Sequence, residues 1–174
     1  IPEVRAIDGS WRSLTTASND YAYGALGSAS WYYPRAWVNP QGKIFILGHY
    51  DAAYTLDISG TGTITKYQTT KPKAGRWELP SVMFSPGKIL SLRRNKIAVI
   101  VNINGNGDPT VTSAGTVSME RLYGNTTVLA DGKVWVNGGS SSGNNLTGAT
   151  LTSELWNPIT NTWTATANAS EVRL

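Results

Sequence analysis

Short apolar runs alternate with polar turns along the whole chain. Apolar residues precede turns such as Ala130-Asp131-Gly132, and short β-branched or aromatic runs such as Val134-Trp135-Val136 follow them. Pro and Asp start turns of this kind, and Gly supplies the positive φ at their ends. The pattern predicts antiparallel hairpins and no convincing helix, because the nearest helical candidate, Asp20 to Trp31, contains too many Gly and Ser residues.

The hairpins form an internal repeat. Gly-Lys pairs begin at positions 42, 87 and 132, so both intervals are 45 residues, and each pair follows a turn and precedes a strand. A third strand and a shorter outer strand follow in each unit, for example Ala53 to Ile58 and then Gly62 to Thr65. Four short antiparallel strands in a unit of about 45 residues are typical of a β-propeller blade.

We therefore expect an all-β chain, a kelch-type β-propeller fragment that forms part of one domain over residues 1–174. The expected parts are a partial outer strand over 4–14, blades over about 31–66, 76–113 and 121–165, and a trailing strand over 171–174. Closed propellers use roughly 4–8 blades. Three blades leave apolar faces and strand edges uncovered, so we expect a second chain or further copies of this chain to complete the ring.

Two propeller classes have this period. WD repeats close on a Trp-Asp pair, which does not occur in this sequence. Kelch repeats carry Gly-Gly after the second strand and a Trp after a later turn, and the third unit supplies Gly138-Gly139, Trp156 and Trp163. In the second unit Arg93-Arg94 stands where Gly-Gly is expected, and the first unit keeps only Gly48. The repeat is therefore of the kelch type, with two degenerate units.

Composition and charge exclude several kinds of protein. The sequence has no Cys, which excludes disulfides, thiolate metal sites and a cysteine nucleophile. The formal net charge of +4 comes with basic clusters such as Lys71 to Arg76, but no nucleic-acid motif accompanies them. No apolar run reaches the roughly 18 residues of a membrane span. The first residues do not resemble a signal peptide, so we expect the chain to come from something longer.

One loop resembles the start of a calcium site. The run Asn102 to Asp108 has alternating Asn and Gly residues, but Ser113 stands where a calcium loop needs its bidentate Glu. Two successive Asn-Gly pairs between strands are also the ordinary signal for a hairpin. We therefore predict a hairpin here rather than a metal site.

Three segments resemble the galactose oxidase and glyoxal oxidase family, the copper radical oxidases. They are Trp31 to Lys43, Asn125 to Val134 with the following Gly138-Gly139, and Ser153 to Trp163. Their order matches the later half of the seven-bladed domain of that family, and the resemblance covers about Trp11 to Leu174.

The resemblance implies oxidation of a primary alcohol, sugar or aldehyde, with O2 reduced to hydrogen peroxide. The family uses copper, held by two Tyr and two His, and a tyrosyl radical cross-linked to a cysteine. None of these ligands carries over, since the chain has no Cys and the adjacent Tyr-His pair of the family would follow a segment like Val172-Arg173-Leu174. The single His49 has no counterpart. We therefore expect no metal, no catalytic residue and no cofactor in this chain alone.

Two positions match residues that face the substrate in the family. Arg35 precedes an inner strand and is a candidate for a substrate-orienting Arg, although a structural ion pair is the alternative role. Tyr123 aligns with an aromatic residue that faces the propeller axis, although packing between blades would equally explain it. The family's His after this aromatic is replaced by Gly124, so a polar contact is lost. Propeller mouths commonly form binding sites.

Two functions remain open from the sequence. In the first, the chain is the propeller scaffold of a secreted or periplasmic galactose oxidase-like enzyme and is inactive alone. In the second, it is a non-catalytic kelch module that binds carbohydrate or protein. The expected ligands are carbohydrates or small alcohols and aldehydes, with no nucleic acid and no membrane.

Overall fold

The computed structural model describes residues 1–24, 35–48, 52–67, 78–143 and 145–171. Nearly all the regular structure in these ranges is β. Apart from two strands that lead the chain, every strand belongs to one of three four-stranded antiparallel sheets. The elements are β1 (Glu3–Arg5), β2 (Trp11–Ser13), α1 (Asp20–Tyr23), β3 (Arg35–Val38), β4 (Ile44–Leu47), β5 (Ala53–Asp57), β6 (Thr63–Lys66), β7 (Ser81–Ser85), β8 (Lys88–Leu92), a 3-10 turn (Arg94–Lys96), β9 (Ile97–Asn102), β10 (Thr110–Thr116), β11 (Asn125–Val128), β12 (Val134–Asn137), β13 (Glu154–Asn157) and β14 (Thr162–Ala165).

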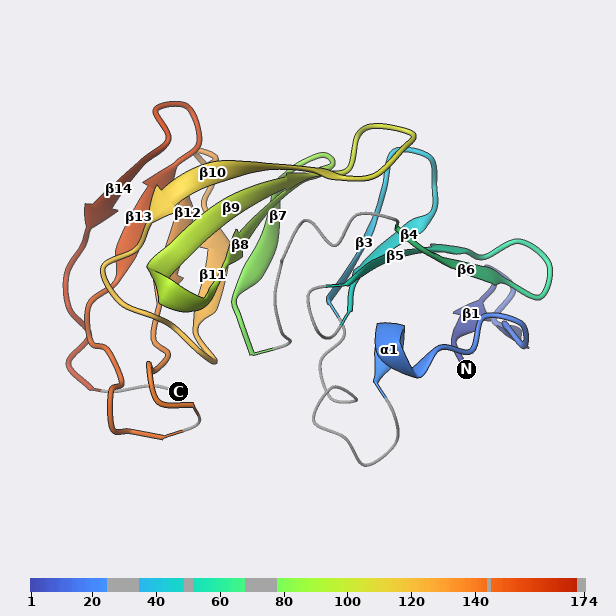
Figure 1. Ribbon diagram of the computed structural model, residues 1–174, viewed down its shortest axis with the longest axis horizontal. Coiled ribbons are helices and arrows are strands. Elements are labelled where there is room, and N and C mark those ends of the chain that lie inside the picture. The colour runs from blue at the N-terminus through green and yellow to red at the C-terminus, as the bar shows by residue number, and fades with distance from the viewer. Residues whose placement is uncertain (25–34, 49–51, 68–77, 144, 172–174) are drawn as a thin grey trace.

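Each four-stranded sheet is a simple meander in which every strand pairs with the next one along the chain. We call them blade 1 (β3–β6), blade 2 (β7–β10) and blade 3 (β11–β14). The three sheets stand side by side in chain order (Figure 1). The all-β prediction of about three four-stranded blades is therefore confirmed, with strands that run over 35–66, 81–116 and 125–165.

The turns that close the first hairpin of each blade follow the predicted chemistry. Gly42, Gly87 and Gly132 all have positive φ, at 76°, 66° and 80°. In blade 1 the Asn39 side chain accepts hydrogen bonds from the two amides that follow it in the turn, those of Gln41 and Lys43. The 45-residue repeat is therefore a repeat of backbone geometry as well as of sequence.

Two segments differ from their sequence predictions. The stretch predicted as one partial strand over 4–14 contains two strands, β1 and β2, because Gly9 (φ 88°) and the Asp8 side chain, which accepts from the Ser10 amide, turn the chain between them. The stretch predicted to lack a helix contains α1. The Asn19 side chain caps α1 by accepting from the Ala22 amide at 2.9 Å, which offsets the poor helix propensity nearby. The predicted trailing strand over 171–174 lies outside the described residues except for Glu171.

The core consists of three apolar layers, one at each junction between neighbouring sheets. Side chains alternate along each central strand, so that Phe45 and Leu47 of β4 face blade 2 while Ile46 faces the β1–β2 hairpin and α1. Between blades 2 and 3, the fully buried Trp156 packs edge-on against Phe84, with ring centroids 4.9 Å apart. Each blade therefore buries its apolar residues against its neighbours.

All the meanders run in the same sense, so the blades have two different ends. The hairpins between the first and second strands and between the third and fourth strands lie at one end of each blade. In blades 2 and 3 this end is the upper edge in Figure 1, whereas the β5–β6 hairpin of blade 1 lies at the right. The β8–β9 loop, the described part of the β12–β13 loop and the segment that joins blade 2 to blade 3 lie at the other end, which we call the crossover end. No helix within the described ranges has the length and apolar character needed to cross a membrane.

Candidate functional site

Tyr123 lies at the crossover end, two residues before β11. Its amide donates a hydrogen bond to the carbonyl oxygen of Glu78 at 2.7 Å, which joins the segment leading into blade 3 to the segment leading into blade 2. The φ of Tyr123 is 59°, in the left-handed region that bulky residues rarely occupy. Such a conformation costs about 1–3 kcal/mol and is found disproportionately at functional sites, and Tyr123 is the one aromatic residue among the four described non-glycine residues that adopt it.

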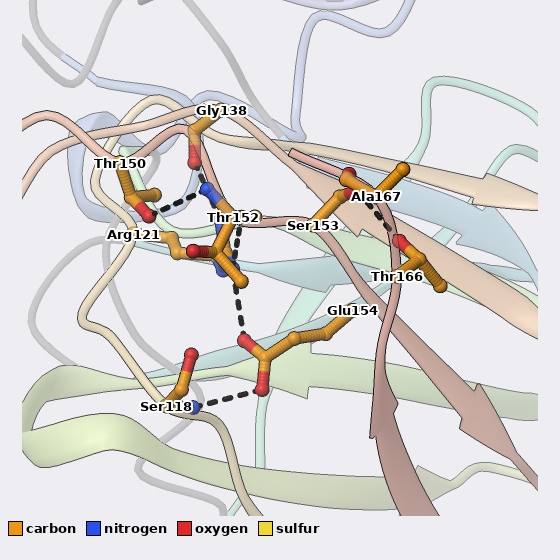
Figure 2. A network of polar contacts seen from close by, with 9 residues as sticks. All are labelled: Ser118, Arg121, Gly138, Thr150, Thr152, Ser153, Glu154, Thr166 and Ala167. Atoms are coloured by element: carbon orange, nitrogen blue, oxygen red, sulfur yellow. Dashed lines mark hydrogen bonds and ion pairs between the residues drawn. The ribbon is translucent and has the colours of Figure 1, made fainter. Parts of the chain in front are cut away.

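Arg121 anchors the segment that carries Tyr123. The Arg121 side chain is almost completely buried and forms a 2.8 Å ion pair with the carboxylate of Glu154. It also donates to the carbonyl oxygens of Gly138 at 3.0 Å and Thr152 at 2.7 Å. The other carboxylate oxygen of Glu154 accepts from the amide of Ser118, as Figure 2 shows. One guanidinium therefore ties the lead-in segment to both ends of the long loop of blade 3.

Glycines allow the segment that leads into blade 3 to touch the start of the β12–β13 loop. A Cβ on Gly139, whose φ is 84°, would lie only 2.8 Å from the carbonyl oxygen of Leu122. A Cβ on Gly124 would lie 3.3 Å from the carbonyl oxygens of Asn137 and Gly138. The Gly-Gly signature of blade 3 thus reflects close backbone approach.

Blade 2 has a charged cluster in place of the Gly-Gly pair. The Arg94 guanidinium contacts the carboxylate of Glu120 at 2.9 Å and lies 3.8 Å from that of Glu78. The loop still needs left-handed backbone, which Asn95 and Lys96 adopt at φ 61° and 63°. Arg94 therefore holds the crossover loop of blade 2 against the segment leading into blade 3, by ion pairing rather than by close backbone approach.

Arg35 is the first residue of β3 and is half-buried. Arg35 pairs with Leu47 on β4, and Leu47 pairs with Ala53 on β5. Leu47 and Ala53 belong to the apolar layer between blades 1 and 2. Burial lowers the pKa of Arg35 from its usual value. Arg35 and Tyr123 both lie at the crossover end, but in blades that flank blade 2 on opposite sides.

The sequence reasoning did not identify Arg121, Glu154 and Glu78 as members of this site. A signal was present, because the 45-residue interval of the Gly-Lys pairs also relates Arg76 to Arg121 and Glu78 to Tyr123. Extending the repeat to the residues before each first strand would have selected Arg121 and Glu78, but not Glu154, whose counterpart 45 residues earlier is Pro109. His49, Arg76 and the run 71–75 lie outside the described residues.

Of the comparisons with known proteins, only the search of solved structures bears on the fold. No family model and no curated protein matches the sequence. A search of solved structures finds a fungal alcohol oxidase of the AA5 family, determined in complex with copper, at a TM-score of 0.84. This chain has the fold of part of the propeller of an AA5 copper alcohol oxidase. The sequence identity is 22%, the match covers 98% of this chain, and it spans only 39% of the length of the oxidase.

The donor set of this chain does not fit a copper centre of the kind that the resemblance implies. That centre needs two His and a cysteine-linked Tyr, whereas the sequence has one His and no Cys. Within the described residues, no group of three or more His, Asp or Glu side chains converges on a point where a metal could bind. We therefore derive no reaction step through copper from the residues of this chain.

Proposed function

We propose that this chain is the propeller portion of a galactose oxidase-like alcohol oxidase, in which it forms the scaffold and one wall of the substrate site. The observation that carries the proposal is the match of almost the whole chain to a copper alcohol oxidase at a TM-score of 0.84. Because the chain spans only 39% of that enzyme, the copper ligands would come from other parts of the full-length protein.

In this proposal the crossover end faces the substrate. Tyr123 supplies an aromatic face and a hydroxyl group, a combination that suits the apolar and polar sides of a sugar or a small alcohol. Arg35 supplies a cation that can donate several hydrogen bonds to hydroxyl groups. The Arg121–Glu154 pair holds the Tyr123 segment in place, so that the site is formed before substrate arrives.

The test uses the full-length protein. Copper content and peroxide release are measured with galactose and with glyoxal as substrates, and copper loading with peroxide production is the expected result. In the copper-loaded enzyme, Tyr123→Ala is expected to raise KM. The matched change Tyr21→Ala, at an exposed position of α1, is expected to leave KM unchanged. A metal-free, inactive full-length protein would reject the oxidase and favour the second candidate.

The second candidate is a kelch module that binds carbohydrate or protein without catalysis. The Gly138-Gly139, Trp156 and Trp163 signature of blade 3 is compatible with it, because kelch features are not specific to oxidases. Titration of the metal-free protein with galactose, followed by tryptophan fluorescence, tests this role. A saturable change that Tyr123→Ala removes would support it, and the absence of binding to sugars would reject it for carbohydrate.

We also propose that a further blade covers the free face of blade 3. Within each blade, paired residues form a row across the sheet that faces the next blade and ends in Thr on the outer strand. The rows are Trp37, Phe45, Thr55 and Thr65 in blade 1, Val82, Leu90, Ile100 and Thr112 in blade 2, and Thr127, Trp135, Leu155 and Thr164 in blade 3. Phe45 is fully buried by blade 2, whereas its counterpart Trp135 is only half-buried.

The occupant of this face would be another part of the full-length protein, a second chain or another copy of this chain. Sedimentation of the isolated chain tests whether further copies of this chain cover the face or whether it stays solvated. We expect self-association that Trp135→Asp weakens and that Leu146→Asp, in an exposed loop, leaves unchanged. A stable monomer that Trp135→Asp does not affect would argue against a covered face in the isolated chain.

A further inference from the structure

The hairpin between β9 and β10 carries two Asn-Gly pairs in succession, Asn104-Gly105 and Asn106-Gly107, and all four residues are exposed. In such a pair the amide nitrogen of the glycine can approach the side-chain carbonyl carbon of the asparagine, because glycine has no Cβ to obstruct it. The two pairs therefore have the same local chemistry. They differ in what the fold does with each asparagine.

The fold holds Asn104 on several sides. Its side-chain nitrogen donates to the carbonyl oxygen of Pro86 at 3.3 Å, and its side chain packs over Gly87, where a Cβ would lie only 2.0 Å from its oxygen. Its main-chain amide donates to the Asn102 side chain at 3.0 Å, and its carbonyl oxygen accepts from Gln41 at 3.4 Å. For the Gly105 nitrogen to attack the Asn104 side-chain carbonyl carbon, that side chain would have to leave the β7–β8 turn.

Asn106 lacks comparable contacts. Neither its side chain nor the amide of Gly107 makes a hydrogen bond to another residue that the structure describes. Apart from Gly107 and its two chain neighbours, no residue has an atom within 4 Å of the position that a Cβ on Gly107 would take. The Asn106 side chain and the Gly107 nitrogen are therefore free to sample the geometry that ring closure needs.

We propose that Asn106 is a site of spontaneous deamidation in the folded protein and that the fold protects Asn104. The Gly107 nitrogen gives its proton to solvent base and attacks the Asn106 side-chain carbonyl carbon. A nitrogen–carbon bond forms, the bond to the side-chain nitrogen breaks, and ammonia leaves. Water then opens the cyclic imide at either carbonyl, which leaves aspartate or isoaspartate. One water is consumed, one ammonia is released, and nothing is oxidised or reduced.

The modification adds one negative charge next to Asp108 and lowers the formal net charge of the chain from +4 to +3. In the isoaspartate product it also lengthens the backbone of the hairpin. The β9–β10 hairpin lies at the end of blade 2 opposite to the crossover end (Figure 1). The modified form should therefore keep the candidate site intact and separate from the original form by cation exchange.

The test is incubation of the folded chain in warm, mildly alkaline buffer, followed by peptide mass mapping. Both pairs are followed in the same molecules, so each serves as a control for the other. We expect conversion of Asn106 to be several-fold faster than that of Asn104, and the two rates to converge when the chain is unfolded in denaturant. Gly107→Ala should suppress conversion of Asn106, whereas Gly105→Ala should leave it unchanged.

Two results would overturn the proposal. One is equal or faster conversion of Asn104 in the folded chain, which would mean that the contacts to Pro86 and Gly87 do not protect it. The other is conversion of Asn106 as slow as that of Asn145, which is exposed but is followed by Leu146. The cation-exchange profile gives an independent readout, because each conversion event shifts the elution of the intact chain.

Discussion

Replacing Arg121 with Met should be among the most destabilising single changes in this chain. The change leaves the Glu154 carboxylate, whose side chain is only 6% exposed, with the Ser118 amide as its remaining partner. It also leaves the carbonyl oxygens of Gly138 and Thr152 without their donor. Breaking one side of a buried ion pair typically costs about 3–5 kcal/mol. This is a large part of the 5–15 kcal/mol by which small proteins are stable.

Urea unfolding followed by tryptophan fluorescence measures the loss as a lower midpoint at unchanged slope. Glu154→Gln keeps an acceptor but removes the charge that faces the buried Arg121, so it is expected to lower the midpoint by a comparable amount, about 3–5 kcal/mol. The double change Arg121→Met with Glu154→Leu should cost less than the sum of the single changes, because the stranded charge is gone.

The matched control is Lys43→Met, which breaks the solvent-exposed pair with Asp57 and should cost at most about 1 kcal/mol. If Arg121→Met costs no more than this surface control, the network does not hold the crossover end together, and the role given to it in forming the site is wrong.

Three further outcomes follow from individual contacts. Thr55→Val should raise stability by about 1 kcal/mol in urea unfolding, because the buried Thr55 hydroxyl has no partner among the described residues; a loss would show that the hydroxyl is satisfied. Trp163→Phe should cost about 1–3 kcal/mol, because the indole N–H donates at 2.6 Å to a carbonyl oxygen of blade 2; no change in the urea midpoint would discount this link. Hydrogen bonds from Ser59 and then from Lys43 lower the pKa of Asp57 to about 2, so its stabilising effect should be full above about pH 4 and fade as the pH falls to 2. The stability difference between the native chain and Asp57→Asn, measured in urea between pH 6 and pH 2, should shrink over that window, and a constant difference would contradict it.

The regular part of the fold could be predicted because the repeat fixes it. The Gly-Lys pairs, the turn residues before them and the alternation of apolar residues give the strands of all three blades. The short α1 could not be predicted, because a single turn depends on the Asn19 cap and not on helix propensity over a window. To predict the β1–β2 hairpin, the turn at Asp8-Gly9 would have had to be recognised in the sequence.

The candidate site was harder to predict from the sequence than the fold. Tyr123 could be selected by resemblance, but its left-handed backbone and its link to Glu78 depend on how two blades meet. The partner of Arg121 lies 33 positions further along the chain and pairs with it only because the long loop of blade 3 returns to the crossover end. Contacts of this kind come from tertiary packing, which the spacing of residue types in the sequence does not encode directly.

The contact of Trp163 with Ala114 has a consequence for how the protein is made. Trp163 lies on the last strand of blade 3 and bonds back to blade 2, so each new sheet completes its packing on one that precedes it in the chain. During synthesis, the earlier sheet has already left the ribosome when its successor emerges, and chains of this kind fold from the N-terminus onward. A growing chain can thus add sheets one at a time onto a finished surface.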